Sequence, residues 1–165
     1  MQIKNKKKIL LFFFIGFLLF NLNLYAEEFD ISAKEIVIDK EDEIIIGKGS
    51  VLATDSEGKR INANKVTYEK SSEFLLAEGD VKIADIDGNI LKSDKATFDK
   101  INEKIITYDY TELILKEGYK LVSKDITYNT KEKILSSNQK SIFTDNDGNI
   151  VETTMFQYNI NDNLF

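Results

Sequence analysis

The sequence has 165 residues, enough for one domain and a short appendage, with 22 Lys and Arg against 28 Asp and Glu. Four lysines and no acid lie in residues 1–26, so the formal charge of −6 becomes −10 over the remaining residues. Such an acidic chain is a poor partner for nucleic acid or an anionic membrane surface. The absence of Cys and His excludes disulfides, thiolate nucleophiles and the commonest general base and metal ligand.

Residues 1–26 are predicted to be a secretory signal peptide. Lysines between positions 4 and 8 precede an apolar run over residues 9–20, and Ala26 is a small residue at the cleavage position. A membrane span needs about 20 apolar residues, so this shorter run favours cleavage over an uncleaved inner-membrane tether. The mature chain, residues 27–165, is expected outside the cytoplasm, where packing and sheet hydrogen bonds must stabilise it without disulfides.

The mature chain is a gapless repeat of thirty residues, with rows beginning at residues 31, 61, 91, 121 and 151. Apolar, small, aromatic and glycine positions recur in columns: Ile31, Ile61, Leu91, Leu121 and Val151; Ala33, Ala63, Ser93, Ser123 and Thr153; Ile38, Tyr68, Phe98, Tyr128 and Tyr158; and Gly58, Gly88, Gly118 and Gly148. Similarity at a fixed period is typical of stacked supersecondary units.

Within each row the apolar period is two, which predicts strands. Residues 74–84 are predicted to form one long strand, because their apolar side chains keep one parity. Gly79 lies at the middle of this strand, where a residue without a Cβ lets the sheet bend. Asp109 and Gln139 replace this glycine in later rows, so the bend is expected to fade along the chain.

The strand at residues 61–68 changes parity between Ala63 and Val66, which predicts a β-bulge near residues 64–65. A polar turn follows at residues 69–72, and a tight turn containing Gly88 is predicted at residues 85–89. Two strands in each row give nine or ten strands, and no segment has a helical apolar stripe. The predicted fold is therefore all-β, built of antiparallel hairpin repeats of thirty residues that stack over a shared core.

No motif in the sequence specifically predicts catalysis or metal binding. A calcium loop starting at Asp85 would need Gly at its sixth position and Glu at its twelfth, but Ile90 and Ala96 stand there, so a turn is favoured. Carboxylates such as Asp109 and Glu112 fall mostly in turns or at outward strand positions. No catalytic residue, metal site or cofactor is predicted.

The aromatic column of Tyr68, Phe98, Tyr128 and Tyr158 has two interpretations. A core ladder is favoured, because aromatic side chains suit a half-buried sheet face. A binding groove is the alternative. The two overlap, since a sandwich that stays open along one side presents its core residues to a ligand.

Several segments resemble the repeat of the OstA-like (organic solvent tolerance) domain. The resemblance lies in INANKVTY at residues 61–68 and AEGDVKI at 77–83, with further copies at 49–51 and 91–98. This domain occurs in the lipopolysaccharide-transport proteins LptA and LptC and at the N-terminus of LptD. The resemblance covers about residues 29–158. It implies a twisted β-jellyroll, open along one edge, with lipid A acyl chains between its two sheets.

The resemblance also implies a function, a non-enzymatic periplasmic conduit that carries lipopolysaccharide toward the outer membrane. Neighbouring jellyrolls would extend the conduit by pairing with its edge strands. Because lipid A is itself anionic, an acidic carrier must hold it by apolar contact. The residues expected to touch acyl chains are Ile36, Ile38, Val66, Tyr68, Leu75, Val81, Ile83, Phe98 and Ile105.

Residues 151–165 form half a row and stop on Leu164 and Phe165 as the next strand begins. This ending favours the N-terminal domain of an outer-membrane-associated LptD-like protein, possessing more chain after Phe165, over a free-standing LptA-like protein. The main rival is a structural β-repeat or adhesin-type scaffold with a closed, dry core and no lipid. A carbohydrate-active enzyme on a β-solenoid is a third reading, which would need an exposed carboxylate pair in a cleft.

Overall fold

The computed structural model describes residues 29–161, so the predicted signal peptide and Leu164–Phe165 lie outside the described residues. The described part is built of strands: β1 (Asp30–Ser32), β2 (Glu35–Asp39), β3 (Ile44–Thr54), β4 (Arg60–Glu69), β5 (Phe74–Ala84), β6 (Ile90–Asp99), β7 (Lys104–Ile114), β8 (Lys120–Lys124), β9 (Thr127–Asn129), β10 (Ile134–Ser137), β11 (Ser141–Thr144), β12 (Ile150–Thr153) and β13 (Phe156–Asn159). Over these residues no helix is long and apolar enough to cross a membrane.

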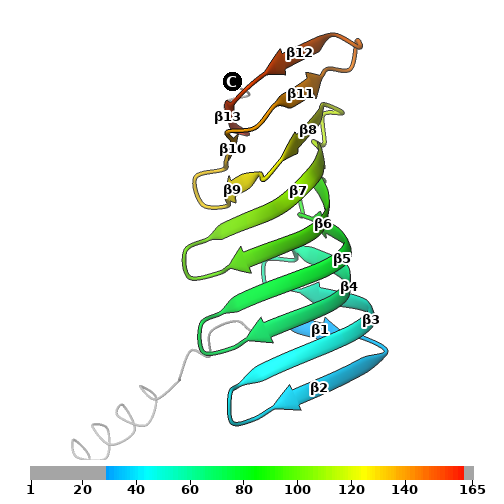
Figure 1. Ribbon diagram of the computed structural model, residues 1–165, viewed down its shortest axis with the longest axis vertical. Helices are drawn as coiled ribbons and strands as arrows, with labels where there is room; N and C mark the ends of the chain where they lie inside the picture. Colours follow the sequence, from blue (N-terminus) through cyan, green and yellow to red (C-terminus); the bar gives the residue numbers. More distant parts are fainter. Residues whose placement is uncertain (1–28, 162–165) are drawn as a thin grey trace, which may run out of the picture.

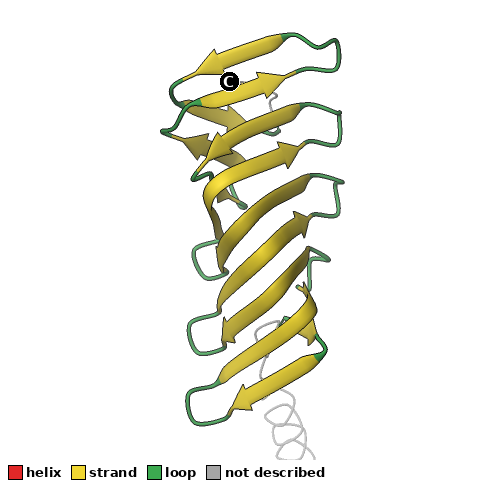
Figure 2. Ribbon diagram, turned by 45° about the vertical axis from the view of Figure 1, so that its right-hand side comes forward, coloured by secondary structure: helices red, strands yellow, loops and turns green. Residues whose placement is uncertain are grey.

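All strand pairing is antiparallel, and the strands stack along the long axis of the molecule, from β2 at one end to β12 at the other (Figure 1). Strands β3 to β7 are unbroken and each spans the full width of the stack, as Figure 2 shows. At both ends a long strand is replaced by two short ones. Two short strands take the place of one long strand in the pairs β1/β2, β8/β9, β10/β11 and β12/β13. Thirteen strands therefore occur where nine or ten were expected.

The pairing divides the molecule into two half-sheets. The first half-sheet contains β1, β8, β11 and β12 with the parts of β3 to β7 next to the glycine turns. The second contains β2, β9, β10 and β13 with the other parts of β3 to β7. The two halves join along a line of bends at mid-strand, which we call the crease. The side opposite the crease, between the two rows of turns, is called the mouth.

The bends at the crease are β-bulges. The register of β4 on β5 shifts between Asn62 and Lys65, which confirms the bulge predicted from the parity change. Gly79 bends β5 with a φ of 76°, in the left-handed region that favours glycine. A Cβ at this position would lie 2.8 Å from Asn64 Nδ2, so the backbone also approaches its neighbour closely. Residues 74–84 form the single long strand that was predicted.

The expected fading of the bend is wrong. Asp109 keeps a positive φ of 58°, and its backbone N–H donates to the Asp125 carboxylate at 2.9 Å. Aspartate tolerates the left-handed region better than most residues, so the bend survives the loss of glycine. At Gln139 the bend sharpens into a break, because this residue lies between β10 and β11.

The predicted glycine turns are present. Gly88 has a φ of 96°, and the Asp85 carboxylate accepts the backbone and side-chain N–H groups of Asn89 at 2.9 and 2.8 Å. Asp145 makes the same bonds with Asn149. The carboxylates therefore stabilise hairpins, as the turn interpretation expected.

The core lies between the half-sheets, and its composition changes at the crease. Alanines 63, 77 and 96 line the crease in the early rows. Hydroxyls replace them later, where Thr111 donates to Thr107 at 2.7 Å and Ser123 and Ser141 lie 2.7 Å apart. Every buried side-chain N or O atom of the described residues has a partner, so these hydroxyls fit an otherwise apolar core.

Candidate functional site

Seven of the nine predicted lipid-contact residues meet in one buried cluster between the half-sheets. Val81 and Ile83 lie on the first half-sheet. The other five lie on the second half-sheet and face them: Val66, Tyr68, Leu75, Phe98 and Ile105. The strand parity that predicted them as inward-facing is therefore correct, and they form the middle of the core.

Ile36 and Ile38 lie outside this cluster, at the N-terminal end of the stack. They pair with Gly47 and Ile45, so their side chains point to the inner face of the second half-sheet. No further strand of the described residues covers them, and they are 44% and 59% exposed. They extend the apolar inner surface to an open end.

The half-sheets touch in the middle of the molecule. A cavity of only about 30 Å³ remains near the mouth, between Ile83 and Leu113 on one side and Ile105 and Tyr128 on the other. Burial, with Asp85 and Asp87 nearby, raises the pKa of the Tyr128 hydroxyl well above its ordinary value, so this phenol stays neutral. The gap has room for about one water molecule. An acyl chain could enter here only if the half-sheets separated.

The C-terminal end is different, because an apolar cavity of about 470 Å³ opens there between the half-sheets. Phe143 and Val151 line it from the first half-sheet, and Met155 and Phe156 line it at the second. Val151 is 60% and Met155 63% exposed. The volume falls within the range of about 300–1,000 Å³ found for small-molecule sites. This apolar space, which we call the end cavity, is therefore large enough for a ligand of that class.

Sequence reasoning did not nominate the residues of the end cavity. The available signal was the fifth row, whose apolar columns contain Val151 and Phe156 and which no further row of the described residues covers. Met155 has no counterpart in the apolar columns of earlier rows, so the repeat could not have revealed it.

The mouth near the N-terminal end is lined by charged turns. A pocket of about 290 Å³ lies there between the glycine turn at residues 55–59 and the four-residue turns of the second half-sheet. Lys59 is buried in its wall, 3.2 Å from the Asp55 carboxylate and with its ammonium 4.7 Å from the centre of the Phe98 ring. Ion pairing and the aromatic face together compensate for burial of this charge.

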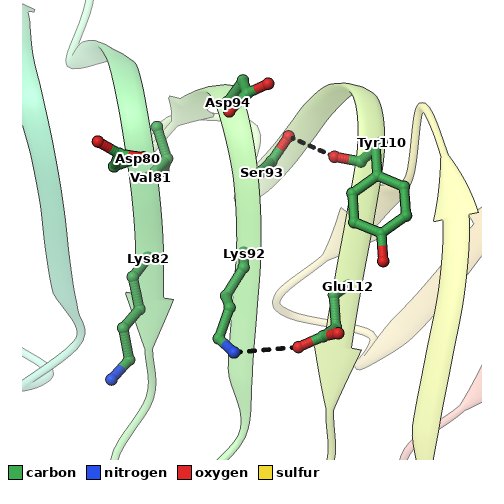
Figure 3. Close-up of a pocket in the computed structure, with 8 residues that line it drawn as sticks. All are labelled: Asp80, Val81, Lys82, Lys92, Ser93, Asp94, Tyr110 and Glu112. Atoms are coloured by element: carbon green, nitrogen blue, oxygen red, sulfur yellow. Dashed lines mark hydrogen bonds and ion pairs between the residues drawn. The ribbon is translucent and has the colours of Figure 1, made fainter.

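A polar depression of about 330 Å³ lies on the outer face of the first half-sheet (Figure 3). Glu112 lies at one end, held by Lys92 at 3.0 Å and by Lys120, while Asp80 and Asp94 lie at the other. Hydrogen bonds from Lys120 and Lys92 lower the pKa of Glu112. A glycosidase acid needs a raised pKa, so Glu112 does not suit that role.

The described residues contain no group of three acidic side chains placed to hold a metal ion.

No protein-family model and no curated protein matches the sequence. Among solved structures, the chain is similar to LptH of Pseudomonas aeruginosa, described as the LptA-homologous periplasmic component of a lipopolysaccharide transport device. The two share 14% identity with a TM-score of 0.60, over 77% of this chain and 94% of LptH. At this identity the likeness establishes the fold, and the predicted all-β, open β-jellyroll is confirmed.

Proposed function

We propose that this chain is a non-enzymatic carrier that holds the acyl chains of lipopolysaccharide between its half-sheets, in a periplasmic bridge to the outer membrane. The observation that carries the proposal is the end cavity, an apolar space of about 470 Å³ that opens between the half-sheets. The fold that the chain shares with LptH, a component of a lipopolysaccharide transport device, supports it.

Apolar contact is the physical basis of binding. Each methylene moved from water into such a cavity contributes about 0.8 kcal/mol, so one acyl chain gains several kcal/mol without any charged contact. The buried cluster would carry the lipid beyond the end cavity once the half-sheets part. Ile36 and Ile38 would contact it at the opposite open end. Because the apolar sites along the interior are similar, a lipid can move from one to the next without being held at a single site of much higher affinity.

The ends of the stack are where partners would join. Along the described chain β2 has a strand neighbour on one side alone, and so has β12. An edge strand of a neighbouring jellyroll could pair with either and align the two apolar interiors. Such a carrier would be either the N-terminal domain of an LptD-like protein or a free-standing LptA-like protein.

The test is photo-crosslinking in cells from benzoyl-phenylalanine placed at Met155 or at Phe98, followed by immunoblotting for lipopolysaccharide. Met155 lines the end cavity and Phe98 lies in the buried cluster. Tyr110 is the matched control, an exposed aromatic residue on the outer face. An ultraviolet-dependent lipopolysaccharide adduct from Met155, absent from Tyr110, is expected.

The second candidate is a structural β-repeat without a lipid ligand, favoured by the tight contact of the half-sheets in the middle. The absence of a lipopolysaccharide adduct from probes at Met155, Phe98, Tyr68 and Leu75 would establish this alternative and contradict the carrier proposal. Equal adducts from Met155 and Tyr110 would show non-specific association and would also contradict it.

A further inference from the structure

The ring of Phe29 closes the mouth at the N-terminal end. It precedes β1 of the first half-sheet, yet it packs edge-on against two rings of the second. Its centroid lies 5.2 Å from that of Tyr68, at an interplanar angle of 76°, and 5.6 Å from that of Phe98, at 79°. Phe29 is only 5% exposed. One side chain therefore ties the two half-sheets together across the opening between them.

The next residue in the repeat column of Phe29 also reaches across the mouth. Thirty residues later stands Lys59, whose ammonium covers the other contact partner of Phe29, the Phe98 ring. Tyr119, sixty residues after Lys59, stacks instead on Phe143 of its own half-sheet, with ring centroids 5.6 Å apart. Lys59 and Tyr119 are each anchored by their glycine turn, since their carbonyls accept the backbone N–H groups of Asp55 and Leu115.

The element that holds Phe29 is short. β1 has three residues, and its register consists of the pairs Asp30–Thr54, Ile31–Ala53 and Ser32–Leu52 on β3. Short terminal strands open at a small fraction of the free energy of global unfolding. Peeling β1 from β3 would carry the Phe29 ring out of the mouth and leave Tyr68 and Phe98 uncovered, while the long strands stay paired.

We propose that Phe29 is an intramolecular latch. Its ring occupies a site for one alkyl chain over Tyr68 and Phe98, and an alkyl chain enters this site only when β1 peels and Phe29 leaves. The identification of that ligand as a lipopolysaccharide acyl chain rests on the proposed function; the latch itself does not. The apparent affinity of the site is then reduced by the small fraction of molecules whose latch is open.

The test uses an engineered disulfide, which the cysteine-free chain allows without background thiols. Asp30→Cys with Thr54→Cys joins two directly paired residues on β1 and β3, outside the buried core. Glu35→Cys with Lys48→Cys is the matched control, because it joins β2 to the same β3 and leaves β1 free. Each full-length protein is exported, purified and titrated with the apolar fluorophore N-phenyl-naphthylamine, oxidised and then reduced.

Oxidation of the Asp30–Thr54 pair is expected to weaken fluorophore binding by about tenfold, reversibly, whereas the control pair changes little. Adding Phe29→Ala to the oxidised Asp30→Cys/Thr54→Cys protein should restore fluorophore binding, because the Phe29 ring rather than β1 fills the site. Binding by the end cavity gives a background common to all variants. Unchanged binding on oxidation, or no rescue by Phe29→Ala, would overturn the latch. The Met155 adduct, which tests the carrier function, does not depend on either result.

Discussion

At the residue scale, Glu112 shows how this protein uses charge. It projects from β7 on the outer face and bridges Lys92 on β6 and Lys120 on β8. Because both lysines stabilise the carboxylate, its pKa is lowered from the ordinary value of 4.5. The network ties three strands together without entering the core. Its contribution should be modest, since exposed ion pairs are worth about 1 kcal/mol or less and networks somewhat more.

Glu112→Gln should lower the free energy of unfolding by about 1 kcal/mol at about pH 7. A carboxyl whose pKa is depressed by folding stabilises the protein above its unfolded pKa, and this stability is lost as the pH falls through the folded pKa. The difference between wild type and variant should therefore shrink below about pH 4. Urea titrations at several pH values measure it, with Glu41→Gln at an exposed turn correcting for the loss of one charge. A pH-independent difference would contradict the prediction.

At the scale of elements, the bends at the crease turn flat hairpins into a jellyroll. Strands β3 and β5 cross from one half-sheet to the other at glycines of positive φ, Gly49 and Gly79. Where glycine is absent, Asp109 adopts the same conformation, fixed by the Asp125 carboxylate. Glycines at the turn tips also have positive φ, but Gly148 has no atom near its missing Cβ. Gly79 at the crease and Gly148 at a turn tip should therefore differ in their tolerance of a side chain.

Gly148→Ala introduces backbone strain alone and should cost about 1 kcal/mol of folding stability. Gly79→Ala adds a clash with Asn64, whose Nδ2 and Cβ would lie 2.8 and 3.0 Å from the new methyl, and should cost about 2–3 kcal/mol. Chemical denaturation of the two variants side by side provides the comparison. If Gly148→Ala proved the more damaging, the close approach at the crease would not be a constraint.

At the scale of the whole molecule, the rows behave as a one-dimensional stack. Each row pairs with the next along both half-sheets, and the turns also connect neighbouring rows: Lys70 N–H donates to the Glu43 carbonyl at 3.0 Å and Thr130 N–H to the Glu103 carbonyl at 2.8 Å. In such architectures stability is approximately a sum of row and interface contributions. In the part of the chain that the structure describes, inner surfaces then remain open at the two ends, where Ile36 and Met155 are exposed.

Deleting residues 91–120, one full row, should leave a folded all-β protein with a lower melting temperature. Ile90 would then precede Leu121, which holds the same position in its own row as Leu91. Deleting residues 91–105 removes half a row, reverses the direction of every later strand and should prevent cooperative folding. Far-ultraviolet circular dichroism with thermal melting distinguishes the two deletions. Similar behaviour of both would show that the thirty-residue register does not govern stacking.

The sequence by itself determined the strand period, the thirty-residue register, the bulge beside Lys65 and the glycine turns, because these follow from local rules of side-chain alternation and backbone conformation. It also placed all nine expected contact residues on the inner faces of the two half-sheets, where seven of them are buried. Contact with a lipid stays a prediction for all nine.

Only the tertiary structure decided how the rows fit together and where they end. It showed that the half-sheets close on each other in the middle, since that depends on side chains meeting across the mouth. It retained the bend at Asp109 through the carboxylate of Asp125, sixteen residues away in the connection between β8 and β9. It also placed Phe29 against Tyr68 and Phe98 and opened the end cavity beside Met155. These features arise from packing between segments distant in the chain, which a repeat pattern does not encode.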